Sequence, residues 1–183
     1  VVVPFRVPVQ RSENQGRVVA LDPGIRTFLT GFSETLVFKL GEGDFSRIAR
    51  LCYHLDRLIS KIAKAKSRQK YRMRKAANRM RWKIRDLIDE LHFKSIRFLL
   101  DRFDLILLPT FETKNMVART KRKIRAKSVR SLLGFSFYKF GQRLESAAKR
   151  EGRAVLRVCE AYTSKTASWT GEIRQIGGAK TIT

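Results

Sequence analysis

Two acidic residues directly follow apolar segments that are typical of β-strands. Asp22 closes the segment of residues 17–22 and precedes Pro23, and Glu112 follows the run DLILLPTF. If these two strands are adjacent and parallel, both carboxylates emerge at one end of the sheet, where they repel each other unless a cation lies between them. Mg²⁺ takes such oxygen ligands and can position a water nucleophile for phosphodiester cleavage. A turn-capping Asp and a surface Glu are the alternative interpretation of the same residues.

The charge of the chain indicates a polyanionic partner. Among 183 residues there are 40 Lys and Arg against 16 Asp and Glu, which gives a formal net charge of +24. Hydrophobic residues make up 43% of the chain, enough for a core, so whole-chain disorder is excluded. Nucleic acid is the expected partner, with an acidic membrane surface as the second candidate. Because charged residues interrupt every apolar run, no membrane span is predicted.

Half of the basic residues lie in two segments that contain no acid. Twelve lie between Lys61 and Arg85 and eight between Lys114 and Arg130. An ordinary solvent-exposed helix mixes both signs, so phosphates are the expected counterions: the first segment runs beside a duplex or heteroduplex backbone, and the second guides a strand toward Glu112. The predicted nucleic-acid-binding residues are Lys61, Lys64, Arg68, Lys70, Arg72, Arg74, Lys75, Arg79, Lys114, Arg119, Lys121, Arg122, Lys123, Arg125, Lys127, Lys165 and Trp169.

The remaining aromatic and histidine residues give weaker signals. Trp169 stands in a polar segment and is the better candidate of the two tryptophans for stacking on bases. Trp82 neighbours an apolar stripe, so stacking and packing both stay open. His54 and His92 have no second ligand at a metal-binding spacing, and both are expected to be structural.

Short apolar runs and a change of periodicity predict the elements that position these residues. Residues 17–22, 27–32 and 35–40 read as a three-stranded antiparallel meander, and residues 104–108 and 154–158 as two further strands. Apolar residues recur at helical spacing from about Asp44 to residue 102, with a break near Ser67 that favours a hairpin of two long helices over a single rod. A further helix is expected from about Ser128 to Arg150. This order predicts an α/β mixed sheet with flanking helices, as in the ribonuclease H-like fold.

Several motifs resemble one known family. The stretch VVALDPGIRTFLTGFS is similar to the first RuvC-type motif of TnpB transposon-encoded proteins and the related Fanzor proteins, and LILLPTFETKNM is similar to the second. The segments DELHFKSIRFLL and EAYTSKT also resemble this family. The resemblance implies an RNA-guided DNA endonuclease, related to the type V CRISPR effectors, which uses Mg²⁺ or Mn²⁺, a guide RNA and a target DNA. It implies that Asp22 and Glu112 are the first two metal-binding catalytic acids. Glu160 has no matching role and is expected to be structural.

The chain departs from the family pattern near its end. Relatives usually carry two cysteine pairs of a zinc module after EAYTSKT and then a third catalytic acid, whereas Ala167 and Thr170 replace the first pair here. No zinc site is therefore predicted. The expected organisation is the end of a preceding β domain or a linker at 1–16, a RuvC-like domain at 17–162 with a helical insertion at about 44–102, and a degenerate or truncated zinc-ribbon-like remnant at 163–183. A first residue other than Met suggests an excerpt of a longer chain.

Three functions remain open. An RNA-guided nuclease of the TnpB/Fanzor type is the first, and a catalytically dead RNA-guided DNA-binding protein is the second, because the third acid is not found. A basic structural RNA-binding protein explains the charge but leaves the motifs unexplained. An intracellular location is expected, cytoplasmic in a prokaryote or nuclear in a eukaryote.

Overall fold

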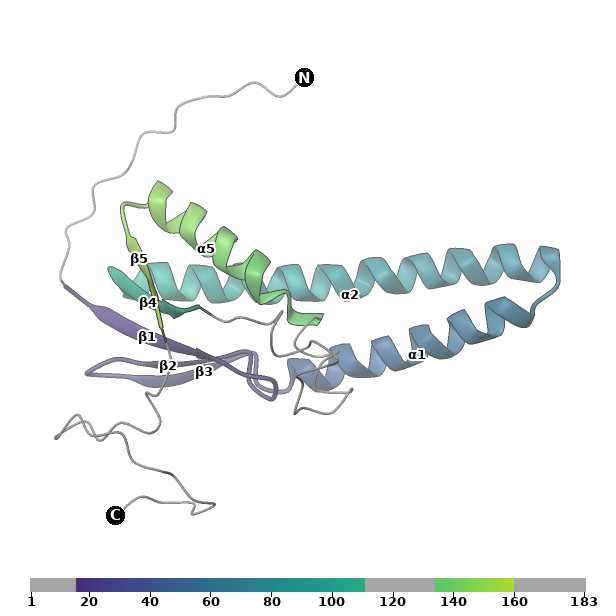
Figure 1. The fold of residues 1–183 in the computed structure, drawn as a ribbon, viewed down its shortest axis with the longest axis horizontal. Helices are drawn as coiled ribbons and strands as arrows, with labels where there is room; N and C mark the ends of the chain where they lie inside the picture. The colour runs from purple at the N-terminus through teal and green to yellow at the C-terminus, as the bar shows by residue number, and fades with distance from the viewer. Residues whose placement is uncertain (1–15, 111–133, 160–183) are drawn as a thin grey trace, which may run out of the picture.

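The fold consists of a mixed sheet covered by helices, from which a pair of long helices extends (Figure 1). The computed structural model describes residues 16–110 and 134–159. The remnant expected at 163–183, and all but Gly16 of the segment expected at 1–16, lie outside these residues. The elements are β1 (Val18–Pro23), β2 (Leu29–Phe32), β3 (Val37–Leu40), α1 (Asp44–Lys64), α2 (Ser67–Arg102), β4 (Leu105–Pro109), α5 (Phe137–Arg150) and β5 (Ala154–Val158).

The sheet has five strands in the order β3-β2-β1-β4-β5. β1 pairs antiparallel with β2, and β2 pairs antiparallel with β3, so the predicted meander is confirmed. β4 pairs parallel with β1, and β5 pairs parallel with β4. Each parallel pairing needs a crossover, which the long helices and α5 provide. The predicted mixed sheet is therefore confirmed.

Alternation along β1 divides the sheet into two faces. Val19 and Leu21 are buried, whereas Val18, Ala20 and Asp22 are exposed on the opposite face. β4 continues the covered face with Ile106, which is fully buried. Because a period of two places alternate residues on opposite faces, the side chain of Asp22 shares a face with Val18 rather than entering the core.

The two long helices pack against each other and reach beyond the sheet (Figure 1). α1 is strongly amphipathic and buries Ile48 and Leu55. The chain turns at Ala65 and Lys66, both in extended conformations, immediately before the predicted break at Ser67. α2 then runs for 36 residues, and its second half packs on the core with Leu99 and Leu100.

The core lies between the sheet, α2 and α5. Its largest fully buried side chains include Phe28, Phe135, Phe140 and Leu144. α5 begins at Phe137 after Ser136, whose φ of 51° is left-handed and interrupts a regular helix. The helix start expected near Ser128 lies outside the described residues. Within the two described ranges, no helix is long and apolar enough to cross a membrane.

Candidate metal-binding edge and nucleic-acid surface

Asp22 stands at the carboxyl end of β1 with an exposed side chain. Pro23 ends the strand, and in the turn that follows the N–H of Gly24 donates to the carbonyl oxygen of Phe28 at 3.2 Å. The proline cannot donate to a further ladder bond, so the sheet ends here. The carboxylate of Asp22 is thus presented at the rim of the sheet, where a soluble ligand can reach it.

β1 and β4 are adjacent and parallel, as the prediction for the two acids requires. Val18 lies opposite Leu105 and Ala20 lies opposite Leu107. The same register places Asp22 level with Pro109, the last residue of β4. Glu112 follows Pro109 by three positions and lies outside the described residues. The arrangement of the strands is therefore confirmed, and the approach of the two carboxylates stays a prediction.

The donor type at this edge suits a hard divalent cation. Asp22 supplies carboxylate oxygens, which Mg²⁺ and Mn²⁺ prefer over nitrogen or sulfur. In the part of the chain that the structure describes, no group of three His, Cys, Asp or Glu side chains converges. A complete metal site at this edge therefore needs further ligands besides Asp22. Glu112 is the ligand that the sequence predicts.

An aromatic cluster fixes the turn that follows Asp22. Phe28, fully buried, has its ring centroid 5.3 Å from that of Phe135 and 5.0 Å from that of Phe140. The imidazole of His92 stacks on Phe28 with a centroid distance of 5.4 Å. Such aromatic contacts add stability beyond simple burial. The cluster joins the β1–β2 turn to α2 and to the start of α5, so the position of Asp22 is set by the core.

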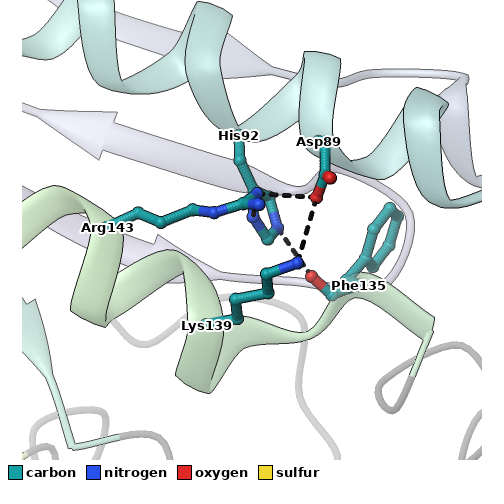
Figure 2. A network of polar contacts seen from close by, with 5 residues as sticks. All are labelled: Asp89, His92, Phe135, Lys139 and Arg143. Carbon is teal, nitrogen blue, oxygen red and sulfur yellow. Dashed lines mark hydrogen bonds and ion pairs between the residues drawn. The ribbon is translucent and has the colours of Figure 1, made fainter. Parts of the chain in front are cut away.

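His92 is the centre of a polar network between α2 and α5 (Figure 2). Its Nε2 lies 2.8 Å from the carbonyl oxygen of Phe135, and its Nδ1 lies 3.2 Å from the guanidinium of Arg143. Because a guanidinium only donates, Nδ1 accepts and Nε2–H donates to the carbonyl. Arg143 also donates to Asp89 at 2.7 Å, and Lys139 contacts the same oxygen at 3.4 Å. The structural role expected for His92 is confirmed.

Burial keeps His92 neutral, and the contacts of the network keep Asp89 charged. Burial lowers the pKa of His92 from 6.5 to about 4, against the smaller opposing effect of its bond to the Phe135 carbonyl. The hydrogen bond from Arg143 lowers the pKa of Asp89. This network could not be predicted from the sequence, since its partners on α2 and near α5 lie 43 to 54 residues apart along the chain.

Asp104 is a second strand-flanking acid, at the opposite edge from Asp22. It is 2% exposed, accepts from the backbone N–H of Arg17 at 3.1 Å and forms ion pairs with Arg17 and Arg153. It therefore joins the starts of β1, β4 and β5. Its buried pairing indicates a structural role, because a metal-binding carboxylate has to remain open to the ion and to substrate. In the sequence, Asp104 differs from Asp22 only in preceding its apolar run, whereas Asp22 follows one.

The first basic segment lies on the α1–α2 hairpin and is largely exposed. Of its eight predicted nucleic-acid-binding residues, all but the half-buried Lys70 are exposed: Lys61, Lys64, Arg68, Arg72, Arg74, Lys75 and Arg79. No ion pair among the described residues involves a cation between Lys61 and Arg85. This surface is thus left with uncompensated positive charge. The other predicted residues lie outside the described ranges: Lys114, Arg119, Lys121, Arg122, Lys123, Arg125, Lys127, Lys165 and Trp169.

The second half of α2 has a different charge pattern. Lys94 pairs with Glu90 at 2.6 Å, and Arg97 pairs with Asp101 at 3.0 Å. Among the described residues of α2, the cations without an ion pair therefore lie between Arg68 and Arg85, toward the tip of the hairpin, apart from Arg102, whose guanidinium lies over the ring of Phe98. Trp82 marks the boundary, and it is 58% exposed rather than packed under the apolar stripe.

Several known proteins are similar to this chain in sequence. A family model described as Cas12f1-like, TNB domain matches residues 137–182. A TnpB-like protein of Acanthamoeba polyphaga mimivirus is 24% identical over 187 residues, covering 97% of this chain and 35% of the relative. A putative transposase of the same virus is 30% identical over 166 residues, covering 87% of this chain and 34% of the relative.

A solved structure shares the fold. A Cas12f1–sgRNA–target DNA complex determined by cryo-EM contains a chain that matches 89% of the present one with a TM-score of 0.54 and 15% sequence identity. The match takes up 41% of that larger chain. The present chain spans about a third of the length of the curated relatives it matches.

Proposed function

This chain belongs to a TnpB/Cas12-related family, and from that premise we propose that it contributes the RuvC-type nuclease domain of a transposon-associated, RNA-guided DNA endonuclease. Residues 17–162 form this domain, the long helices are its insertion, and residues 163–183 are the remnant of a target-binding module. Guide RNA and target DNA are its partners, in the cytoplasm of a prokaryote or the nucleus of a eukaryote.

The strand order supports a ribonuclease H-like domain. An antiparallel meander is followed by two parallel strands in the order β3-β2-β1-β4-β5, with α2 and α5 packed on the core. A fold alone does not determine chemistry. The assignment therefore depends on what stands at the carboxyl edge of the central strands.

The parallel pairing of β1 with β4 is the observation that carries the proposal. It presents Asp22 at the same edge toward which β4 leads the chain to Glu112. In open α/β sheets, ligands bind outside the carboxyl ends of the parallel strands. A nuclease site at this edge follows the general rule for sheets of this kind.

Asp22 and Glu112 would hold the divalent ion. A bound Mg²⁺ supplies positive charge that favours a water nucleophile and stabilises the leaving oxygen of a phosphodiester. The protein's own contribution is to hold Asp22 through Pro23 and the buried Phe28, so that the carboxylate is in place before substrate arrives. The cations of the α1–α2 hairpin bind phosphates and keep the polyanion near this edge.

The test is guide-dependent cleavage by the protein, with and without Mg²⁺. Asp22→Asn and Glu112→Gln each remove a carboxylate with little change of shape. We expect both to abolish detectable cutting while guide-directed binding of the target persists. Glu34→Gln, an exposed acid between β2 and β3, is the matched control and is expected to cut as the wild type does.

The possible outcomes separate the competing functions. Equal cutting by Asp22→Asn and the wild type would remove the catalytic assignment. Guide-directed binding with no cutting by the wild type would make the chain a binding-only relative. Binding that ignores complementarity between guide and target would favour a structural RNA-binding protein.

A further inference from the structure

Two exposed aromatic rings lie on one face of α2. Tyr71 is 70% exposed and Trp82 is 58% exposed. They are eleven residues apart, which corresponds to three full helical turns and a further rotation of about 20° about the helix axis. Both side chains therefore project from the same face of α2. Along the helix axis they are separated by roughly 16 Å.

This face points away from α1. Met80 is half a turn from Tyr71 and Trp82 and lines a hollow with Leu58 of α1. Ala77, which is 1% exposed, is also on the packed side. The two rings therefore take no part in the contact between α1 and α2. The buried and half-buried residues on the opposite side of α2 provide that contact.

Cations flank the two rings on the same face of α2. Arg74 and Lys75 are one turn after Tyr71, and Arg85 is one turn after Trp82. All three are exposed, and no ion pair of the described residues involves them. We name this surface, made of Tyr71, Arg74, Lys75, Trp82 and Arg85, the aromatic–basic ledge.

The next aromatic residue on this face belongs to a different environment. Phe93 follows Trp82 by a further eleven residues and is 57% exposed, but the guanidinium of Arg143 lies 4.8 Å from its ring centroid. Asp89, between Trp82 and Phe93, pairs with that same arginine. The ledge therefore ends at Arg85, because acids balance the charge beyond it.

We propose that the aromatic–basic ledge binds an unpaired polynucleotide strand, whose bases stack on Tyr71 and Trp82 and whose phosphates lie against Arg74, Lys75 and Arg85. A duplex backbone uses the cations but leaves both rings in water, because its base faces are already stacked on each other. A single strand uses rings and cations together. At 3.4 Å per stacked base, the two rings are about five nucleotides apart.

This inference rests on the nucleic-acid part of the proposed function and not on its catalytic acids. The chain has two tryptophans, so Trp169→Phe leaves Trp82 as the sole indole reporter. In EDTA, the full chain with this background is titrated with ten-nucleotide single strands, oligo(U) RNA in one arm and oligo(dT) DNA in the other. A ten-base-pair duplex is the comparator.

We expect single strands to quench the emission of Trp82 and duplex to leave it nearly unchanged. Stronger quenching by oligo(U) than by oligo(dT) assigns RNA as the ligand, and the reverse assigns DNA. Tyr71→Ala is expected to weaken single-strand binding about 5- to 150-fold, whereas Tyr71→Phe keeps the ring and the affinity. Phe93→Ala, on the same helix, is the control and should bind as the background does.

The salt dependence gives an independent measure of the phosphate contacts. Arg74→Gln, Lys75→Gln and Arg85→Gln should each lower the log–log salt slope of single-strand binding by about 0.7. Two results would contradict the proposed binding at the aromatic–basic ledge. One is quenching by duplex equal to that by single strands, and the other is a loss of affinity in Tyr71→Ala no larger than that in Phe93→Ala. Because these measurements need neither guide nor Mg²⁺, their failure leaves the cleavage test untouched, and a failed cleavage test leaves the ledge standing.

Discussion

Asp22 and Asp104 both flank apolar strands, yet the fold gives the two carboxylates opposite environments. Asp22 follows its strand and is exposed at the carboxyl edge, whereas Asp104 precedes its strand and is buried with Arg17 and Arg153 at the amino edge. The place of Asp22 could be predicted because the strand and the following Pro23 are local signals. The role of Asp104 could not be predicted, since Arg17 and Arg153 are distant along the chain.

His92 makes stability depend on pH through its lowered pKa. As pH falls from 6.5 toward about 4, the imidazole of the unfolded chain binds a proton while the folded one stays neutral. The unfolding free energy should therefore drop by roughly 3 kcal/mol across this window. We expect His92→Gln to be less stable at neutral pH and to lack this drop, as measured by urea unfolding from pH 7.5 to 4.

The other charges near His92 act in a lower pH range. Asp89 on α2, whose pKa is lowered by its hydrogen bond from Arg143, gives stability that is lost only as pH falls below 3.8. His54 is the only other histidine and is exposed, so His54→Gln should keep the wild-type slope. A His92→Gln slope that matches the wild type would show that this imidazole is not held neutral.

The strands could be predicted closely from the sequence, and the interruption of the helix at Ser136 could not. Apolar runs and turn residues are local features, and each strand lies within two residues of its predicted start and one of its predicted end. α5 begins at Phe137 because Ser136 is left-handed and because Phe135 meets Phe28 and His92 in the core. Contacts of that range leave no periodic signal in the sequence.

The turn between β3 and α1 depends on Gly41. Its φ of +70° is left-handed, and a Cβ there would lie 2.8 Å from side-chain atoms of Leu91 and Phe28. Gly41→Ala should therefore combine backbone strain with overpacking, and we expect a loss of about 2–4 kcal/mol in unfolding free energy. Denaturant unfolding at neutral pH provides the measurement.

Gly43 is the matched control for that substitution. Its φ is +85°, but no atom lies within 4 Å of the position of an added Cβ. Gly43→Ala should show the backbone strain alone, a loss of about 1–2 kcal/mol. If both variants lose the same unfolding free energy, overpacking against Leu91 and Phe28 does not contribute to the loss in Gly41→Ala.

At the level of the whole molecule, charge separates the hairpin from the helices that cover the sheet. The tip of the α1–α2 hairpin lies away from the sheet in Figure 1, and the cations of residues 61–85 take part in no ion pair of the described residues. Where α2 meets α5, cations are paired with Asp89 and Asp101, and Lys94 pairs with Glu90 along α2 itself. A long polyanion is therefore expected to follow the hairpin rather than the α2–α5 surface.

The candidate site could be predicted in part, for reasons that differ between its components. The adjacency of β1 and β4 follows from strand order and connection rules, so the shared edge was predictable. The aromatic–basic ledge could not be predicted, because the sequence left open whether Trp82 packs in the protein or lies in solvent. The 58% exposure of Trp82 in the structure decides between these alternatives.

The most direct test of the account is whether Asp22 and Glu112 bind one divalent ion together. Mn²⁺ binding to the full chain can be followed by the EPR signal of free Mn²⁺ for the wild type, Asp22→Asn, Glu112→Gln and the double variant, with Glu34→Gln as control. We predict that each single variant loses about tenfold or more in affinity and that the double variant loses clearly less than the product of the two. Affinities that both single variants keep at the wild-type value, or losses that multiply independently, would contradict a shared ion at this edge.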